Sequence, residues 1–354
     1  MSTPTQLLLL CVLADNALGF MSIARPRSHA DVRVTAFPMS IVARPSADGV
    51  SEFSEKAAIA AAAKVTSVPL VLPDALADGP VESSFISTDV EPQPGVPPIV
   101  MLHSFDSSCL EWRRVLPLLA AEGLEAYALD ILGWGFSETS NARGVSVEAK
   151  RAHLLAFCQQ HLDGRPALLV GSSLGAAAII DLGDCGGHQT LIYLVPSLTF
   201  ERISSPAYIV ASSPSAAEGV VLLDPQALID GTPPVPAFAA RGGVRLLKSW
   251  PLRAFGQKLA YEDLERCDTD DAIRIGRVHC ERAGWEDDAV SWLLGGGYSV
   301  SKLLPRLRDT RCLILWGRQD RVLPPADNVP KFVSLLPTAD FRWVESCGHV
   351  PHLE

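Results

Sequence analysis

One short segment constrains the rest of this chain: a Gly-Ser-Ser-Leu-Gly turn at residues 171–175, with an apolar run on each side. The run before the turn (167–170) is typical of a buried strand, and the run after it (176–180) is typical of a helix. A strand that turns directly into a helix needs glycine wherever a Cβ would meet the neighbouring backbone. The segment therefore predicts an α/β fold with Ser173 raised at the carboxyl end of a central strand. The helix N-terminus and the Leu174 amide would point at its oxygen.

Further candidate strands surround this segment. Each is a short apolar run that ends in a polar or Gly-rich turn, and helix-like segments separate them: 98–103, 125–130, 167–171, 219–224, 311–316 and 340–344. This pattern is typical of a parallel sheet that helices cover on both faces. Ligands of such sheets bind beyond the carboxyl ends of the strands. The residues that directly follow the strands are therefore the candidates for a functional site.

An acid and a base follow the last two of these strands. Asp320 comes after residues 311–316, and His349 comes after residues 340–344. With Ser173 they give a nucleophile, an acid and a base in the chain order Ser, Asp, His. Serine is a poor nucleophile unless a base takes its proton. We expect His349 to be that base and Asp320 to orient its imidazole.

Each of these residues has an alternative nearby. Ser172 is adjacent to Ser173, but the third position of the turn belongs to Ser173. Asp224 also ends a strand and remains a second candidate for the acid. His352 lies three residues after His349 and has no preceding glycine, so we expect a structural role for it.

Two other polar residues at strand ends are expected to be structural. Asp130 is predicted to anchor the turn at 133–135 by side-chain-to-backbone hydrogen bonds. His103 is predicted to orient the loop that it begins. The remaining histidines have no metal-ligand spacing: His153, His161, His188 and His279.

Composition limits the partners of the chain. Its 354 residues are 48% hydrophobic, which is enough for one large domain. A net charge of −10 without a Lys/Arg-rich run argues against nucleic acids and anionic membranes. The eight cysteines are scattered and include no Cys-x-x-Cys pair, so we expect no metal, no cofactor and no disulfide framework. No stretch approaches the roughly 20 apolar residues of a membrane span, and the sequence does not indicate an oligomeric state.

The first 50 residues have the composition of a targeting presequence or a disordered tail. Residues 7–13 form a short apolar run, and residues 17–19 are a small-x-small cleavage pattern. The segment that follows, 20–44, is rich in arginine and poor in acids, as transit peptides are. This order resembles the bipartite plastid presequence of algae with secondary plastids. We expect a plastid location, with a cytoplasmic or secreted protein as the alternatives.

From about residue 81 to residue 354 the chain resembles the α/β-hydrolase superfamily, in particular its serine esterase/haloperoxidase-like members from cyanobacteria and plastids. The resemblance rests on residues 103–113, 129–137, 171–175, 316–320 and 348–354. It implies an α/β-hydrolase fold: a mostly parallel sheet, flanking helices and a helical lid. It also implies that the Phe105 amide joins the Leu174 amide as an oxyanion-hole donor.

The chain departs from the family pattern in three places. Ser104 stands where the family has glycine, so the backbone there must be one that a Cβ permits. Residues 183–217 are far longer than the usual connection and are interpreted as a surface insertion or a gene-model artefact. The sequence ends five residues after His349, where the family continues into a closing helix, so we expect that helix to be missing.

The remaining segments are a linker and a lid. Residues 51–80 are expected to be a linker or a peripheral helix, with a helical patch at 55–64 and the compact domain from about Val81. The lid is expected at about 225–300, with helices around 261–267 and 287–294. Four aromatic residues of the lid either line an apolar cavity or pack the lid onto the body: Trp250, Phe255, Trp285 and Trp292.

These features predict a serine hydrolase that cleaves an ester, thioester or similarly activated carbonyl of a small or medium apolar substrate. Serine at position 173 disfavours epoxide hydrolase and haloalkane dehalogenase chemistry, which needs a carboxylate there. Carbon–carbon bond hydrolysis and perhydrolysis use similar triads and remain open. A ligand receptor that keeps the triad with negligible turnover is the alternative from another class.

Overall fold

The computed structural model describes residues 45–182, 217–232, 234–265, 267, 269–309 and 312–354. Residues 1–44 of the expected presequence therefore lie outside the described residues. Of the unusual segment 183–217, only Ala217 is described. Among the described helices, none combines the length and the apolar character that crossing a membrane requires.

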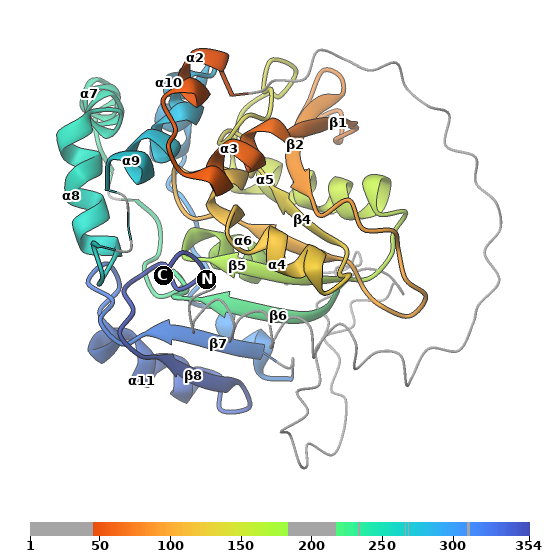
Figure 1. Ribbon diagram of the computed structural model, residues 1–354, viewed down its shortest axis with the longest axis vertical. Coiled ribbons are helices and arrows are strands. Elements are labelled where there is room, and N and C mark those ends of the chain that lie inside the picture. Colours follow the sequence, from red (N-terminus) through yellow and green to blue (C-terminus); the bar gives the residue numbers. More distant parts are fainter. Residues whose placement is uncertain (1–44, 183–216, 233, 266, 268, 310–311) are drawn as a thin grey trace.

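A single eight-stranded sheet organises the described chain (Figure 1). Its strands are β1 (Thr66–Leu70), β2 (Val81–Ser87), β3 (Ile99–Leu102), β4 (Ala126–Leu129), β5 (Ala167–Ser172), β6 (Ala217–Leu223), β7 (Cys312–Gly317) and β8 (Asp340–Val344). They lie in the order β1-β2-β4-β3-β5-β6-β7-β8. All pairs from β4 to β8 are parallel, whereas β1 and β2 are antiparallel to their neighbours. All six predicted strands are present and form the parallel part.

Strands β1 and β2 were not predicted, and β1 lies before Val81, where the compact domain was expected to begin. β1 contains Pro69 and is mostly half-exposed, as an edge strand can be. In β2, Ser83 and Ser84 are buried, which interrupts the apolar pattern. The Ser83 hydroxyl is hydrogen-bonded to His153, and the Ser84 amide donates to the Ser137 hydroxyl. The sheet therefore starts earlier in the sequence than the apolar runs indicate.

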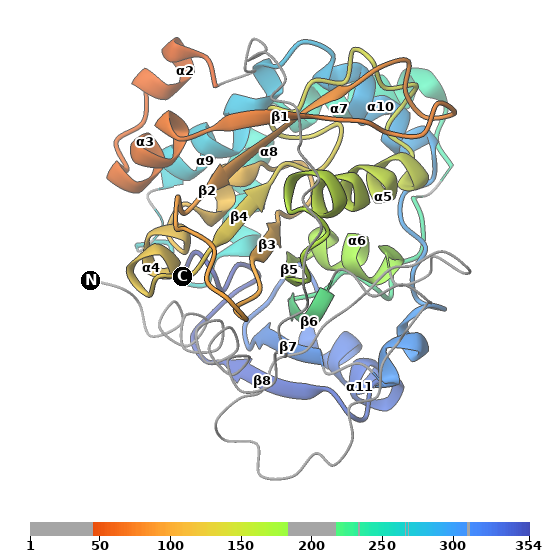
Figure 2. The same ribbon diagram turned by 90° about the vertical axis from the view of Figure 1, so that its right-hand side faces the viewer.

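Helices cover both faces of the sheet, because alternate strand residues point to opposite sides. In β3, Val100 and Leu102 join one apolar cluster, whereas Ile99 and Met101 join the other. Figure 2 shows α3 (Lys56–Ala63) and α4 (Leu116–Ala121) on one side. The opposite side carries α5 (Val147–Ala156), α6 (Leu174–Leu182) and α11 (Pro325–Leu335).

Helix α3 coincides with the helical patch expected at 55–64, and it is packed against the body. Ala58, Ala61 and Ala62 are buried in the core, where their small side chains allow close approach. Just before the helix, the Glu55 carboxylate accepts hydrogen bonds from Arg113 at 2.9 Å and from Arg114 at 2.8 Å. This segment is tied to the domain by apolar and charged contacts.

Four helices between β6 and β7 form the lid: α7 (Ala237–Leu247), α8 (Trp250–Ala260), α9 (Thr269–Val278) and α10 (Trp285–Leu294). They lie together on one side of the molecule, at the left in Figure 1. The helix expected at 287–294 is part of α10. The helix expected at 261–267 is wrong, because Tyr261 has an extended backbone that ends α8. Shorter helical segments are α2 (Ala47–Ser51), η2 (Cys109–Trp112), η3 (Phe157–His161), η4 (His279–Glu281) and η5 (Leu304–Asp309).

Candidate active site

Ser173 occupies the tight turn between β5 and α6 with a φ of 50°, which is rare for a residue with a side chain. Three backbone hydrogen bonds hold it there. Its N–H donates to the Leu223 carbonyl at 2.8 Å, and its own carbonyl accepts from Ala176 at 3.1 Å and from Gln226 at 3.0 Å. A strained backbone of this kind persists only where its surroundings fix it.

The glycines on either side of Ser173 are required by space. A Cβ on Gly171 would lie 2.6 Å from the Ala176 nitrogen, and a Cβ on Gly175 would lie 2.4 Å from the Leu102 carbonyl oxygen. Both distances are too short for any side chain. The close approach that the sequence predicted for this turn is confirmed.

His349 and Asp320 meet at the ends of β8 and β7. The His349 Nδ1 lies 2.8 Å from Asp320 Oδ2, and both side chains are buried. The other Asp320 oxygen accepts backbone hydrogen bonds from Val322 at 2.7 Å and Leu323 at 2.8 Å, which fix the carboxylate. A carboxylate on Nδ1 places the proton there and leaves Nε2 as the basic nitrogen.

Asp224, the second candidate acid, lies beside this pair. Oxygen or nitrogen atoms of Asp224, Asp320 and His349 all lie within 4.8 Å of one another. One Asp224 oxygen accepts from the Gly317 amide at 2.9 Å, and the other has no partner among the described residues. Burial, and next the charge of Asp320, raise the pKa of Asp224 well above its usual range. Asp320 is therefore the acid that holds the imidazole, and Asp224 is the acid whose ionisation burial disfavours.

A cavity of about 400 Å³ brings Ser173 and His349 together beneath the lid. Its apolar lining comes largely from the lid and the last residues of the chain, including Leu247, Leu252, Phe255, Val350 and Leu353. Within the described part of the chain, Ser173 and His349 form no direct hydrogen bond, an arrangement that often tightens only when substrate binds.

The four lid aromatics have different surroundings. Phe255 is exposed and lines the cavity that contains Ser173, whereas Trp250 does not line it. Trp285 and Trp292 are buried in packing contacts of the lid. Phe255 therefore lines the cavity, Trp292 packs the lid onto the body against Trp134, and Trp285 packs within the lid.

The loop after β3 presents the Phe105 amide beside this cavity. Neither this amide nor the Leu174 amide has a hydrogen-bond partner among the residues that the structure describes. His103 fixes the preceding peptide: its Nε2 accepts from the Ile131 amide at 3.0 Å, so its Nδ1 donates to the Ser104 carbonyl at 2.7 Å. Because the peptide is planar, this bond also directs the Phe105 N–H.

His103 is neutral in this position. It is fully buried, and burial lowers its pKa to about 4. Neutrality is what its hydrogen bonds require, because a protonated ring could not accept from the Ile131 amide. The role that the sequence predicted for His103, orienting its loop through hydrogen bonds, is confirmed.

Glu111 anchors the same loop, and the sequence analysis did not identify it. Its carboxylate accepts from the Ser104 amide at 3.1 Å, from the Ser104 hydroxyl at 2.8 Å and from His352 Nε2 at 3.0 Å. Ser104 lies outside the left-handed region, so the Cβ at this position is accommodated as expected. The Ser172 hydroxyl lies 3.1 Å from the Ser104 hydroxyl oxygen and can donate to it, which engages the alternative nucleophile in a structural contact.

Asp130 stabilises the neighbouring turn. One carboxylate oxygen accepts from the Cys109 amide at 2.6 Å and the other from the Phe136 amide at 2.8 Å. A Cβ on Gly135 would lie 2.0 Å from this carboxylate, so the turn closes tightly around it. The prediction that Asp130 anchors this turn is confirmed.

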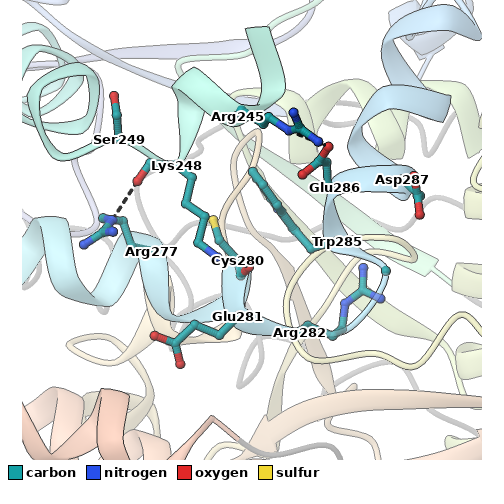
Figure 3. Close-up of a pocket in the computed structure, with 11 residues that line it drawn as sticks. Arg245, Lys248, Ser249, Arg277, Cys280, Glu281, Arg282, Trp285, Glu286 and Asp287 are labelled. Carbon is teal, nitrogen blue, oxygen red and sulfur yellow. Dashed lines mark hydrogen bonds and ion pairs between the residues drawn. The ribbon is translucent and has the colours of Figure 1, made fainter. Parts of the chain in front are cut away.

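A second cavity, of about 560 Å³, lies within the lid (Figure 3). Its cationic side chains are engaged: Arg245 pairs with Glu286, and Arg277 donates to the Lys248 carbonyl. Trp285 lines this cavity as well. The charges around this cavity are directed at neighbouring protein groups.

The comparisons with known proteins agree with this architecture. The sequence matches the alpha/beta hydrolase family over residues 99–354. The chain belongs to this family. It is 33% identical over 308 residues to the alpha/beta hydrolase domain-containing protein VTE7 of Arabidopsis thaliana, covering 86% of this chain and 84% of that protein.

Solved structures of hydrolases share the fold. A thermophilic esterase from Thermogutta terrifontis has a TM-score of 0.60 and 18% identity, over 82% of this chain and 93% of that one. The 2-hydroxy-6-oxo-6-phenylhexa-2,4-dienoate hydrolase of Rhodococcus sp. strain RHA1 has a TM-score of 0.57 and 19% identity. The match covers 82% of this chain and 94% of that one. At these identities the likeness concerns the fold.

Proposed function

We propose that the protein is a serine hydrolase that cleaves an ester, thioester or similar activated carbonyl through a Ser173–His349–Asp320 triad. The observation that carries the proposal is the His349–Asp320 hydrogen bond of 2.8 Å at the cavity that Ser173 also lines. A serine held on a strained turn beside an oriented, buried imidazole is the arrangement that acyl transfer needs.

The mechanism follows from these positions. The His349 Nε2 removes the Ser173 proton as the hydroxyl oxygen attacks the substrate carbonyl carbon. The amides of Phe105 and Leu174 stabilise the resulting oxyanion, and each donor contributes about 3 kcal/mol in the transition state. His349 then protonates the leaving group, and an acyl-enzyme remains. Water, activated by the same imidazole, releases the acid and restores Ser173.

The cavity supports an apolar substrate of small or medium size. Its volume of about 400 Å³ lies within the usual range for small-molecule sites. Leu252, Phe255 and Ile275 from the lid line it, so an apolar acyl or alcohol group would displace water there. The charged groups at the cavity, such as Asp106 and Arg253, are already paired with each other.

Hydrolysis of p-nitrophenyl esters of increasing acyl length tests the proposal. We expect multiple turnovers by the native chain and a loss of at least about 10⁴-fold in kcat for Ser173→Ala. Ser172→Ala is the matched control and should retain turnover, because the Ser172 hydroxyl contacts Ser104. A single slow turnover with a ligand-induced rise in melting temperature would instead favour a receptor.

We propose that the protein acts in a plastid. The proposal rests on the arginine-rich, acid-poor composition of residues 20–44 after a short apolar run. N-terminal sequencing of the protein isolated from its organelle should find cleavage near Phe20 and again before the folded region. A protein isolated from the organelle that still begins with Met1 would contradict the proposal that residues 1–44 contain a cleaved presequence.

A further inference from the structure

Asp106 directly follows Phe105 and has a strained backbone. Its φ of 48° lies in the left-handed region, which aspartate tolerates better than most residues but does not prefer. Its side chain is buried, and it lines the same cavity as Ser173. A strained residue persists where neighbouring groups determine its conformation, so the contacts of Asp106 bear directly on the position of Phe105.

Those contacts come from three separate elements of the lid. Arg253 of α8 donates to Asp106 Oδ2 and, at 3.2 Å, to the Asp106 carbonyl. His279 of η4 and Trp285 of α10 both donate to Oδ1 at 3.0 Å. Burial opposes ionisation of Asp106, but the His279 hydrogen bond and the Arg253 charge outweigh it and lower the pKa of the carboxyl. The lid thus holds an ionised carboxylate.

A metal ion is the other occupant that this donor set suggests, because Asp106, His279 and Cys280 have suitable atoms within 4.8 Å of one another. The Arg253 guanidinium argues against it. The same Nη2 that donates to Asp106 lies 3.3 Å from Cys280 Sγ, so a fixed positive charge already lies within the cluster. Both Asp106 oxygens accept from N–H groups. We therefore interpret the cluster as a set of hydrogen bonds between the lid and Asp106, and not as a metal site.

Phe105 is therefore held from two sides. On its N-terminal side, Ser104 is fixed to the body by Glu111 and His103. On its C-terminal side, Asp106 is fixed to the lid. We infer that Asp106 is a positioning residue through which the lid holds the Phe105 amide in the oxyanion hole. This inference rests on the proposed function, because it assigns the Phe105 amide to the oxyanion.

The geometry couples enclosure of the substrate to catalysis. Helix α8 carries Arg253 and also contributes Leu252 and Phe255 to the cavity lining. A displacement of α8 would therefore open the cavity and, at the same time, remove the Arg253 contact from Asp106. With Asp106 released, nothing on the lid side would oppose relaxation of its left-handed backbone. The oxyanion hole would then be complete only with the lid in place.

Asp106→Asn tests this inference. Asparagine keeps the size of the side chain and tolerates the left-handed region, but it lacks the charge that Arg253 binds. Losing an oxyanion donor outright costs 10²–10³ in kcat, so we expect a misplaced donor to lower kcat by about 10- to 100-fold, with KM changed by less than about threefold. Affinity for a trifluoromethyl ketone, whose adduct with serine carries an oxyanion, should fall by the same factor.

Asp288→Asn is the matched control. Asp288 also joins the lid to the body: it accepts from Thr139 and from Arg282, which in turn donates to the Gly133 carbonyl. It does not contact the loop of Phe105. We expect its kcat and inhibitor affinity to remain at native values. Equal losses in Asp288→Asn would show general loosening of the lid and would overturn the inference.

Trp285→Phe gives a second, milder variant that keeps the packing and removes one donor to Asp106. We expect kcat to fall by about 2- to 10-fold, with no further fall when it is combined with Asp106→Asn. If both variants fold and keep native kcat and inhibitor affinity, Asp106 is not a positioning residue. A different result would contradict the proposed function itself: ester turnover by Ser173→Ala at the native rate.

Discussion

At the scale of single residues, the site contains two aspartates at strand ends: Asp320, the expected acid, and Asp224, the second candidate. Asp224 and Asp320 both follow strands of the parallel sheet, and only the structure shows that His349 binds Asp320. Asp224 lies against them in a fully buried position that raises its pKa well above its usual range. The two residues therefore differ in their roles although they lie together: Asp320 binds the imidazole, whereas burial disfavours ionisation of Asp224.

Asparagine at each position separates their roles. Asp320→Asn should lower kcat by about 10⁴-fold, because an amide would favour the wrong imidazole tautomer and could not stabilise the imidazolium. Asp224→Asn should stay within about tenfold of the native kcat, since asparagine keeps the shape of the side chain and an oxygen that can accept from the Gly317 amide. Steady-state ester kinetics on both variants measure this contrast. Equal losses would identify Asp224 as a second essential acid.

Contacts far apart in sequence explain what could not be predicted at this scale. The strand ends and the Gly-x-Ser-x-Gly spacing indicated Ser173, Asp320 and His349, because parallel strands bring their carboxyl ends to one edge. Asp106 and its partner His279 are 173 positions apart, and no periodicity connects them. Their pairing depends on how the lid packs against the body.

At the scale of elements, the turn between β5 and α6 is limited by the approach of β3. A Cβ on Gly175 would lie 2.4 Å from the Leu102 carbonyl. We expect Gly175→Ala to lower the free energy of unfolding by about 1–3 kcal/mol or more, because backbone must move to admit the methyl group. Urea unfolding measures this change.

Gly242 in α7 is the matched control for that substitution. Apart from its chain neighbours and the backbone of its own helix, no atom lies within 4 Å of the Cβ that alanine would add, and the φ of Gly242 is not positive. Gly242→Ala should raise the free energy of unfolding by about 0.5–1 kcal/mol, because alanine restricts the unfolded chain and favours the helix. If Gly175→Ala did not lower the free energy of unfolding either, β3 could not approach Gly175 as closely as described.

Apolar runs predicted strands β3 to β8, including the half-exposed edge strand β8, and missed the antiparallel strands β1 and β2. Strands β3 to β8 are fully or largely apolar, and their positions agree with the sequence analysis. Strand β2 buries Ser83 and Ser84, whose hydrogen-bond partners come from distant loops and helices. A pattern that relies on hydrophobicity alone cannot find a strand of this kind.

At the scale of the whole molecule, residues 45–80 are part of the domain. They contribute β1 to the sheet and buried alanines of α3 to the core. Glu55 also pairs with Arg113, whose side chain is only 3% exposed. Removing this segment would leave a buried guanidinium without its carboxylate.

A chain that starts at Val81 should therefore be less stable than one that starts at Pro45. Breaking one buried ion pair costs about 3–5 kcal/mol, so we expect the thermal midpoint to fall by roughly 10 °C or more. Differential scanning calorimetry of the two chains measures the difference. The same midpoint for both would mean that the domain does not depend on α3 and β1.

The central claim, that Ser173 is the nucleophile activated by His349, is tested most directly by labelling with a fluorophosphonate and mapping the adduct by mass spectrometry. We predict one adduct per chain on the peptide that contains Ser173, no adduct in Ser173→Ala, and strongly slowed labelling in His349→Ala. An adduct on a different residue, or ester turnover that continues with Ser173 unlabelled, would contradict the account.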